Sequence, residues 1–169
     1  TFISQNKALP GSYINFVSAA RAQAALSERG VATMPLILDW GPDGEVFAVT
    51  AEEFQKNSLR IFGHAYGDEE MKGLRGLFRN IRTGYFYKPN TGGVKAANDL
   101  ASAKYAGSRG NALKIAVAAN EASSEEAPLY DVSTWLGSTL VDSQTKVSAA
   151  SELLPNDFVE WKSGAALAA

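Results

Sequence analysis

Val31-Ala-Thr-Met-Pro-Leu-Ile-Leu38 is a mostly apolar run, interrupted only by Thr33 and Pro35. Its length suits a strand that is buried on both faces, although Pro35 favours an edge position or a bulge. The turn residues Asp39-Trp-Gly-Pro-Asp-Gly44 then end the strand, and Val46 to Val49 has the pattern of a second short strand. The chain is therefore expected to enter a layer that contains a sheet at residue 31.

Two helices and a third strand are predicted to follow. Thr50-Ala-Glu-Glu53 fits a capping box, in which the threonine caps a helix of about two turns and the second glutamate reaches back. A second helix is expected to start near Asp68, whose carboxylate can cap free amides, and Gly84-Tyr-Phe-Tyr87 is expected to be a strand. We therefore expect a small α/β layer over residues 31–89, with one face of the second helix buried against the strands. That face carries Met71, Leu74, Phe78 and Ile81, at spacings of three and four.

From Thr91 onward, short alternating runs between Gly, Asn and Ser breaks replace the helical pattern. Regular turn spacing of this kind predicts a small β-sandwich or barrel. The boundary between the two patterns is expected at Thr91-Gly-Gly93. The candidate strands are residues 100–105, 113–119, 129–134, 138–141 and 147–149.

The stretch Ala106-Gly-Ser-Arg-Gly-Asn111 superficially resembles a phosphate-cradling loop. A P-loop, however, has a lysine followed by serine or threonine at the start of a helix, whereas Leu113-Lys-Ile-Ala-Val117 has the pattern of a strand. A hairpin turn between residues 100–105 and 113–119 is therefore favoured over nucleotide binding.

An extended, half-apolar arm precedes these elements. Thr1-Phe-Ile-Ser-Gln-Asn-Lys-Ala-Leu-Pro-Gly-Ser-Tyr-Ile-Asn-Phe16 carries β-forming residues on both sides of the break at Pro10-Gly11. So few residues cannot bury their side chains against one another, so they must pack on the rest of the protein or on another molecule. Apolar terminal strands of this kind add to the sheet edge of a neighbour. The candidate inter-subunit contacts are Phe2, Ile3, Tyr13, Ile14 and Phe16.

These patterns together predict an α+β fold in three regions. Residues 1–20 are the extended N-terminal arm, residues 21–90 contain the small α/β layer, and residues 91–169 form a mostly β domain of the sandwich or barrel type. Because the chain starts without methionine and ends in Leu167-Ala-Ala169, we also expect a larger parent protein.

The composition is that of an ordinary globular chain. It has 169 residues, of which 46% are hydrophobic and 20% charged, and its formal net charge is −2. With this balance of charges, the chain as a whole has no positive electrostatic field that would attract DNA or an anionic membrane. No apolar run approaches the roughly 20 residues of a membrane span. We therefore expect neither nucleic-acid binding nor membrane insertion.

Candidate catalytic and metal-ligating residues are few. The chain has no cysteine, and its one histidine, His64, cannot build a histidine-based metal site or a catalytic triad without unusual partners; a loop histidine near the helix start is the favoured reading. The run Asp68-Glu-Glu70 could chelate a hard cation, but carboxylates in a first helical turn more often cap the helix. Trp40, Trp135 and Trp161 could form a stacking platform, but packing in a core or an interface is favoured. We therefore predict no catalytic residue, no metal site and no cofactor.

Three segments resemble the contractile-tail sheath proteins of bacteriophages and phage-derived particles. Phe2-Ile-Ser-Gln-Asn-Lys7, with Pro10-Gly-Ser-Tyr-Ile-Asn-Phe16, resembles the start of that family. Gly30-Val-Ala-Thr-Met-Pro-Leu-Ile-Leu-Asp-Trp-Gly-Pro42 resembles its first core strand and turn. Ala103-Lys-Tyr-Ala-Gly-Ser-Arg-Gly-Asn-Ala-Leu-Lys-Ile-Ala-Val117 resembles the strand, turn and strand that open its inserted β domain. The residues of the family-pattern turn are Gly107, Arg109, Gly110 and Asn111.

The resemblance is closest to the sheaths of Gram-positive myophages and PBSX-like prophages. It implies subunits that stack as hexameric rings around a tail tube and contract to drive the tube into a target cell. The implied partners are other sheath subunits, joined by arms that share strands, together with the tail tube and the baseplate. The implied location is a virion or phage-tail-like particle that is assembled in the bacterial host cytoplasm. A sheath protein continues past the inserted domain into a C-terminal region that completes the core, and this region is expected to be absent from a chain that stops at Ala169.

We therefore interpret the chain as the N-terminal part of a contractile tail sheath subunit, with a structural rather than an enzymatic role. One alternative is an enzyme fragment such as a hydrolase, which the lone histidine and the absence of cysteine and phosphate motifs disfavour. The other is a β-rich adhesion or glycan-binding module of a phage-like particle that uses the tryptophans.

Overall fold

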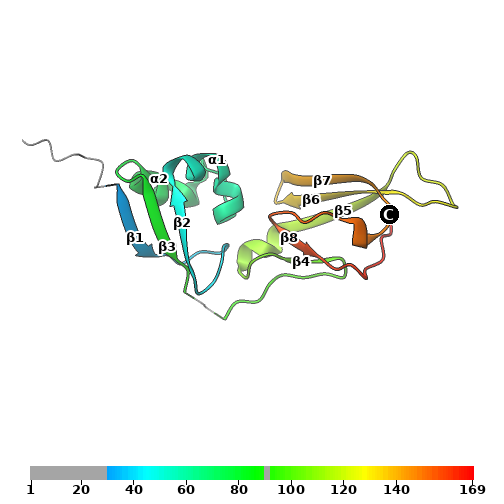
Figure 1. Cartoon of the computed structure of the whole chain (residues 1–169), viewed down its shortest axis with the longest axis horizontal. Helices are drawn as coiled ribbons and strands as arrows, with labels where there is room; N and C mark the ends of the chain where they lie inside the picture. Colours follow the sequence, from blue (N-terminus) through cyan, green and yellow to red (C-terminus); the bar gives the residue numbers. More distant parts are fainter. Residues whose placement is uncertain (1–29, 90–91) are drawn as a thin grey trace, which may run out of the picture.

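The computed structural model describes residues 30–89 and 92–169. These residues form two parts that lie next to each other along the long axis of the molecule (Figure 1). The first, here called the α/β part, comprises residues 30–89, and the second, the β part, comprises residues 92–169. The predicted arm, residues 1–20, lies outside the described residues, and the division into three regions stays a prediction.

The α/β part is built on a three-stranded sheet. Its strands are β1 (Val31–Pro35), β2 (Val46–Thr50) and β3 (Thr83–Tyr87). Their order is β1-β3-β2, and β3 is parallel to β1 and antiparallel to β2. One face of the sheet is covered by α1 (Ala51–Phe62), η2 (Glu69–Met71) and α2 (Lys72–Phe78). Pro35 is the last residue of β1, an edge strand of the sheet. Proline has no backbone N–H, and at an edge this costs no hydrogen bond to a neighbouring strand.

The core of the α/β part is aromatic. Phe54 and Phe62 from α1 and Phe86 from β3 have no exposed surface, and Phe54 stacks on Phe78 with ring centroids 4.8 Å apart. Leu74 is 7% exposed and packs in the same cluster. The prediction that the second helix buries an apolar face is therefore confirmed for Leu74 and Phe78, whereas Met71 lies in η2 and Ile81 follows the end of α2.

The predicted capping box at the start of α1 is present. The side-chain oxygen of Thr50 accepts a hydrogen bond from the Glu53 amide at 3.2 Å, and the Glu53 carboxylate accepts one from the Thr50 amide at 2.9 Å. The hydrogen bonds from the Thr50 backbone and side chain hold the pKa of Glu53 below its ordinary value. The helix is longer than the predicted two turns, with 12 residues and a non-helical Asn57 inside it.

The predicted cap of the second helix is wrong. The Asp68 carboxylate makes no capping hydrogen bond to η2 or α2 and instead accepts one from the backbone amide of Ala65 at 2.7 Å. The reason is that η2, a short 3₁₀ turn, precedes α2, so Asp68 closes the loop after α1 rather than the helix start.

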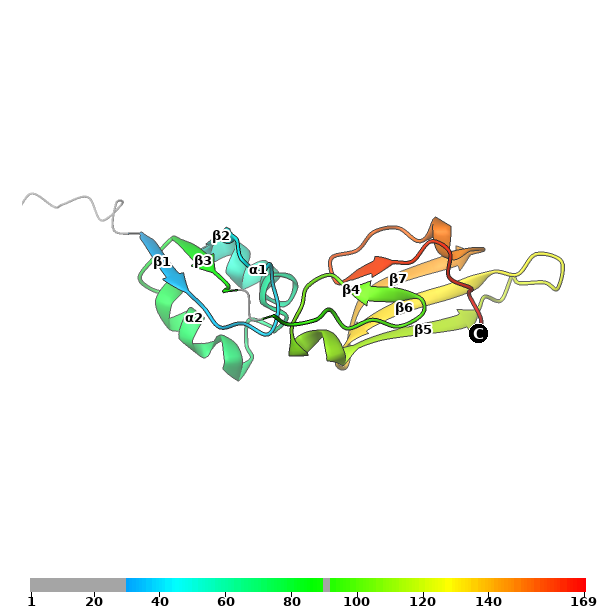
Figure 2. The ribbon, with the colours of Figure 1, turned by 90° about the horizontal axis from the view of Figure 1, so that it is seen from below.

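The β part contains two antiparallel sheets (Figure 2). Phe158, Leu136 and the two alanines Ala101 and Ala103 pack in the core between them. The small sheet pairs β4 (Ala101–Ala103) with β8 (Val159–Trp161), and the larger one orders β5 (Leu113–Ala119), β6 (Tyr130–Leu136) and β7 (Thr139–Val147). Two short 3₁₀ helices, η3 (Ser108–Ala112) and η4 (Ala150–Glu152), complete it. The predicted α+β fold with a mostly β second half is confirmed.

Strand pairing differs from the prediction in three places. The predicted hairpin around Ala106–Asn111 is wrong: β4 pairs with β8, β5 pairs with β6, and residues 108–112 form η3 between them. In place of the two predicted strands at 138–141 and 147–149 there is one strand, β7, which ends at Val147 and stays paired with β6 across two register shifts. The strand β8 was not predicted, since three residues carry too little alternation to stand out. Among the described residues, no helix is long and apolar enough to cross a membrane.

Candidate functional site at the junction of the two parts

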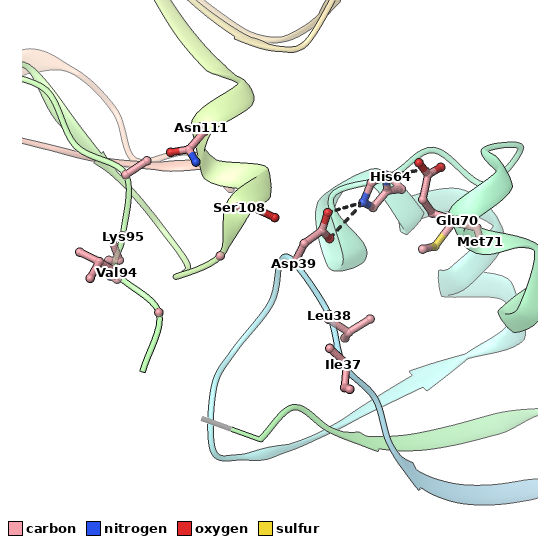
Figure 3. Close-up of a pocket in the computed structure, with 13 residues that line it drawn as sticks. Ile37, Leu38, Asp39, His64, Glu70, Met71, Val94, Lys95, Ser108 and Asn111 are labelled. Atoms are coloured by element: carbon pink, nitrogen blue, oxygen red, sulfur yellow. Dashed lines mark hydrogen bonds and ion pairs between the residues drawn. The ribbon is translucent and has the colours of Figure 1, made fainter. Parts of the chain in front are cut away.

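A cleft of about 760 Å³ lies where the α/β part meets the β part (Figure 3). Asp39, His64 and Glu70 line it from the α/β part, and Lys95 and Asn111 line it from the β part. Figure 3 shows these two groups of side chains on opposite walls. The contacts that join the α/β part to the β part are made by residues that lie far apart in the sequence.

Trp40 joins the cores of the two parts. It follows β1 in sequence, yet it has no exposed surface and belongs to the cluster that contains Ala101 and Phe158 of the β part. Its ring lies edge-on to Tyr105 at 5.3 Å and stacks on Phe158 at 6.1 Å. Its indole Nε1–H donates to the carbonyl oxygen of Arg60 at 3.1 Å, so the polar end is satisfied. The predicted core role of this tryptophan is confirmed.

Lys88 is a buried cation at the end of β3. It is 2% exposed, and its Nζ donates to the carbonyl oxygens of Gly41 at 3.1 Å and Ala106 at 2.7 Å. The same nitrogen lies 2.7 Å from the carboxylate of Asp43. A buried ammonium with a charged partner and two carbonyl acceptors is satisfied, whereas an unpaired one would be very costly. Because Gly41 and Ala106 belong to different parts, Lys88 ties them together.

The family-pattern turn also lies at the junction. Gly107 has φ +143°, and a Cβ at this residue would come to 2.1 Å from the carbonyl oxygen of Asp39. The backbone amide of Arg109 donates to that same oxygen at 3.2 Å, and its side-chain Nε donates to the carbonyl oxygen of Gly63 at 2.6 Å. Only glycine permits this approach of two backbones. The turn therefore connects the β part to two loops of the α/β part.

The other two residues of the turn have different surroundings. Gly110 is buried, and a Cβ there would lie 3.2 Å from the side chain of Ala103 and 3.3 Å from that of Ala96. Asn111 is exposed on the wall of the cleft. The assignment of these four residues to a family-pattern turn stays a prediction.

His64 lies in the loop after α1, as predicted, and is 7% exposed. Its Nε2–H donates to both carboxylate oxygens of Asp39, at 3.0 and 2.9 Å. Its Nδ1 faces Glu70, whose Oε2 is 3.8 Å away. The side-chain partners given for His64 among the described residues are both carboxylates, so these contacts orient the imidazole and do not by themselves form a catalytic triad.

The outer face of the three-stranded sheet is open and uncharged. Val31, Val46, Tyr85 and Tyr87 are 59%, 61%, 41% and 38% exposed, because the helices cover the other face only. The prediction that the first strand is buried on both faces is therefore wrong for β1. By register, the nine residues of this open face are Val31, Thr33, Pro35, Val46, Ala48, Thr50, Thr83, Tyr85 and Tyr87.

Residues of the predicted arm, Phe2, Ile3, Tyr13, Ile14 and Phe16, lie outside the described residues. Sequence reasoning missed Lys88 and the junction role of Trp40. The signal for Lys88 was its position, because a lysine directly after the apolar run 84–87 and before Pro89 continues a buried segment. No local signal places Trp40, whose aromatic ring partners, Tyr105 and Phe158, lie more than sixty residues away.

Comparison with known proteins identifies relatives that match most of the chain. Residues 91–168 match the family described as the phage tail sheath protein beta-sandwich domain. The phage-like element PBSX protein of Bacillus subtilis (strain 168) is 30% identical over 162 residues, which are 93% of this chain and 33% of that protein. An uncharacterized protein of the same organism matches with the same identity and coverage.

Two solved structures share the fold. The sheath tail protein of Desulfitobacterium hafniense has a TM-score of 0.70 and 30% identity, over 94% of this chain and 36% of that one. The sheath tail protein of Listeria innocua has a TM-score of 0.67 and 28% identity, over 86% of this chain and 34% of that one. The chain thus spans about a third of the length of these relatives.

Proposed function

We propose that this chain belongs to the phage tail sheath protein family and that it is the N-terminal part of a structural subunit of a contractile tail sheath. Such subunits polymerise around a tail tube as stacked hexameric rings and contract to drive the tube through the envelope of the target cell. The observation that carries the proposal is the likeness to the Desulfitobacterium sheath tail protein over 94% of this chain, which includes both the α/β part and the β part.

The junction supports a mechanical role. Trp40, Lys88 and Gly107 fasten the two parts through a shared core, a buried cation and a close backbone approach. A subunit that transmits force between neighbours requires its parts to move as one body, because a loose hinge would absorb the displacement. No residue of the junction is assigned a catalytic role in this proposal.

The open face of the sheet supports a role in assembly. Nine uncharged residues form it, with Tyr85 and Tyr87 on its central strand, β3. Contiguous uncharged surface with exposed tyrosines is typical of protein contact surfaces. The centres of protein interfaces contain few charged residues and many aromatic ones, as this face does. We propose that this face is covered in the assembled sheath.

The proposed partners are other sheath subunits, the tail tube and the baseplate, and the proposed location is a virion or phage-tail-like particle assembled in the bacterial host cytoplasm. The arm, with Phe2, Ile3, Tyr13, Ile14 and Phe16, would join neighbouring subunits by adding a strand to a sheet edge. The alternative of a glycan-binding module loses one of its three tryptophans, because Trp40 is fully buried and cannot stack on a sugar, while Trp135 and Trp161 are half-buried.

The experiment that tests the proposal is deletion of residues 1–16 from the full-length protein. Sedimentation velocity should show large assemblies for the parent and only small species for the truncated protein, with the same circular dichroism spectrum for both. The control is Leu154→Ala, a change at a surface leucine that is 69% exposed and far from the arm in sequence. If the truncated protein sediments like the parent, the arm is not required for assembly and this part of the proposal is wrong.

A further inference from the structure

Three side chains from the loop after α1 and the start of η2 bring possible metal-ligand atoms, one nitrogen and two oxygens, together beside the cleft. A ligand atom each of His64, Asp68 and Glu70 all lie within 4.8 Å of one another. Figure 3 shows His64 between Asp39 and Glu70, with both carboxylates directed at the ring. We propose that His64, Asp68 and Glu70 bind one divalent transition-metal ion, in a site that lies beyond the sheath function.

The imidazole can offer the lone pair of its Nδ1 to a metal ion. His64 is more than nine-tenths buried, and among the described residues its Nδ1 has no hydrogen bond. Its other nitrogen, Nε2, is held by both oxygens of Asp39. A metal-bound histidine characteristically donates its second ring N–H to a carboxylate, which fixes the tautomer and the ring orientation. Asp39 therefore acts as a positioning residue that turns Nδ1 toward the two carboxylates.

The local charge also favours a cation. Within the described part of the chain, neither the Asp68 nor the Glu70 carboxylate forms an ion pair with a lysine or an arginine. Arg75 is the nearby cation on this segment, and it donates to the backbone oxygens of Tyr66 and Asp68 rather than to a carboxylate. Three carboxylates, those of Asp39, Asp68 and Glu70, thus surround one imidazole.

The donor set indicates the class of metal. One imidazole nitrogen and two carboxylate oxygens suit Zn²⁺ and its first-row neighbours, whereas Mg²⁺ and Ca²⁺ prefer oxygen alone. Zinc holds such ligands at about 2.0–2.2 Å, so the donors must move closer together than they lie here. Glu70 can supply this movement, because its side chain is 61% exposed, while Asp68 keeps one oxygen on the Ala65 amide. The lone histidine thus finds the unusual partners that a metal site requires.

The test is zinc titration of the full chain, followed by calorimetry and by NMR of the imidazole resonances. His64 is the only histidine among 169 residues without cysteine, so the assignment is unambiguous. We expect one zinc ion per chain and a saturable shift of the Nδ1 resonance. Glu70→Gln and Asp68→Asn should each weaken zinc binding at least tenfold, and Asp39→Asn should weaken it about 10–100-fold.

The matched control is Glu69→Gln, since Glu69 is adjacent in sequence and is paired with Lys72 at 2.8 Å instead of with His64. It should bind zinc as the unchanged chain does. Unchanged thermal midpoints without metal show that the variants remain folded. Imidazole resonances that do not move with zinc, zinc affinity that is equal in Glu70→Gln and Glu69→Gln, or a preference for Mg²⁺ over zinc would each overturn the proposal.

Discussion

Gly107 and Asp39 approach so closely that a Cβ on residue 107 would lie 2.1 Å from the Asp39 carbonyl oxygen. That oxygen accepts the backbone amide of Arg109 at 3.2 Å, so the turn of the β part docks directly on the loop after β1. The relative placement of the two parts therefore depends on a residue without a side chain.

Replacing Gly107 tests this docking. Gly107→Ala should lower the free energy of unfolding by about 3 kcal/mol or more, because strained backbone and a steric clash act together. Gly44→Ala is the matched control, since Gly44 has φ +72° but no atom within 4 Å of the place that a Cβ would take, and should cost about 1–2 kcal/mol. Urea unfolding of both variants measures the difference. Equal losses would mean that the backbone approach contributes nothing.

Removing the buried ammonium should be more damaging than removing an exposed one. Lys88→Met leaves the Asp43 carboxylate and the carbonyls of Gly41 and Ala106 without their partner, at a cost of about 3–5 kcal/mol. Lys95→Met breaks the ion pair with Glu160, whose side chains are 43% and 57% exposed, and should cost about 0–1 kcal/mol. Thermal and urea unfolding check both values. A Lys88→Met variant as stable as Lys95→Met would show that Lys88 does not hold the junction.

Truncating Leu74 tests the packing of α2 on the sheet. Leu74→Ala should destabilise the chain by about 2–5 kcal/mol, because the side chain is 7% exposed and lies in the aromatic cluster. Leu154→Ala, at a leucine that is 69% exposed, should change stability by no more than about 0.5 kcal/mol. Denaturant midpoints of the two variants give the comparison. A loss at Leu74 no larger than that at Leu154 would mean that α2 does not contribute to the core.

Acid should weaken two sets of local hydrogen bonds that a glutamate accepts, one in the capping box of α1 and one between Ser148 and Glu152. The pKa of Glu53 is lowered by hydrogen bonds from Thr50, and that of Glu152 by hydrogen bonds from Ser148. A carboxyl with a lowered pKa in the folded state stabilises it above the unfolded-state pKa, and this contribution disappears as pH falls through the folded-state value. The stability difference between the unchanged chain and Glu53→Gln should therefore be largest near neutral pH and shrink below about pH 4. Urea unfolding across this pH range measures it, and a difference that grows toward low pH would contradict the capping geometry.

Local signals predicted most elements but not their partners. The capping box at Thr50 and the alternation that gives β5 are contained in a few neighbouring residues, so both were found. The partner of β4 is β8, which follows it by more than fifty residues, and no pattern around residue 101 encodes that distance. The predicted hairpin failed for this reason, although both of its strands exist.

The junction illustrates the same limit. The sequence showed that Gly107, Arg109 and Gly110 follow a family pattern, but only the fold shows that Gly107 meets Asp39 and that Arg109 reaches Gly63. His64 was correctly placed in a loop, whereas its contact with Asp39 joins residues 25 positions apart. Such contacts arise from tertiary packing, which single-sequence periodicity does not record.

We propose that the chain belongs to a subunit whose function lies in a regular lattice of copies. Negative-stain electron microscopy of the full-length protein at increasing concentration tests this claim most directly. The proposal predicts tubes or stacked rings of one fixed diameter. Separate globular particles at every concentration, with the chain folded as judged by circular dichroism, would contradict it.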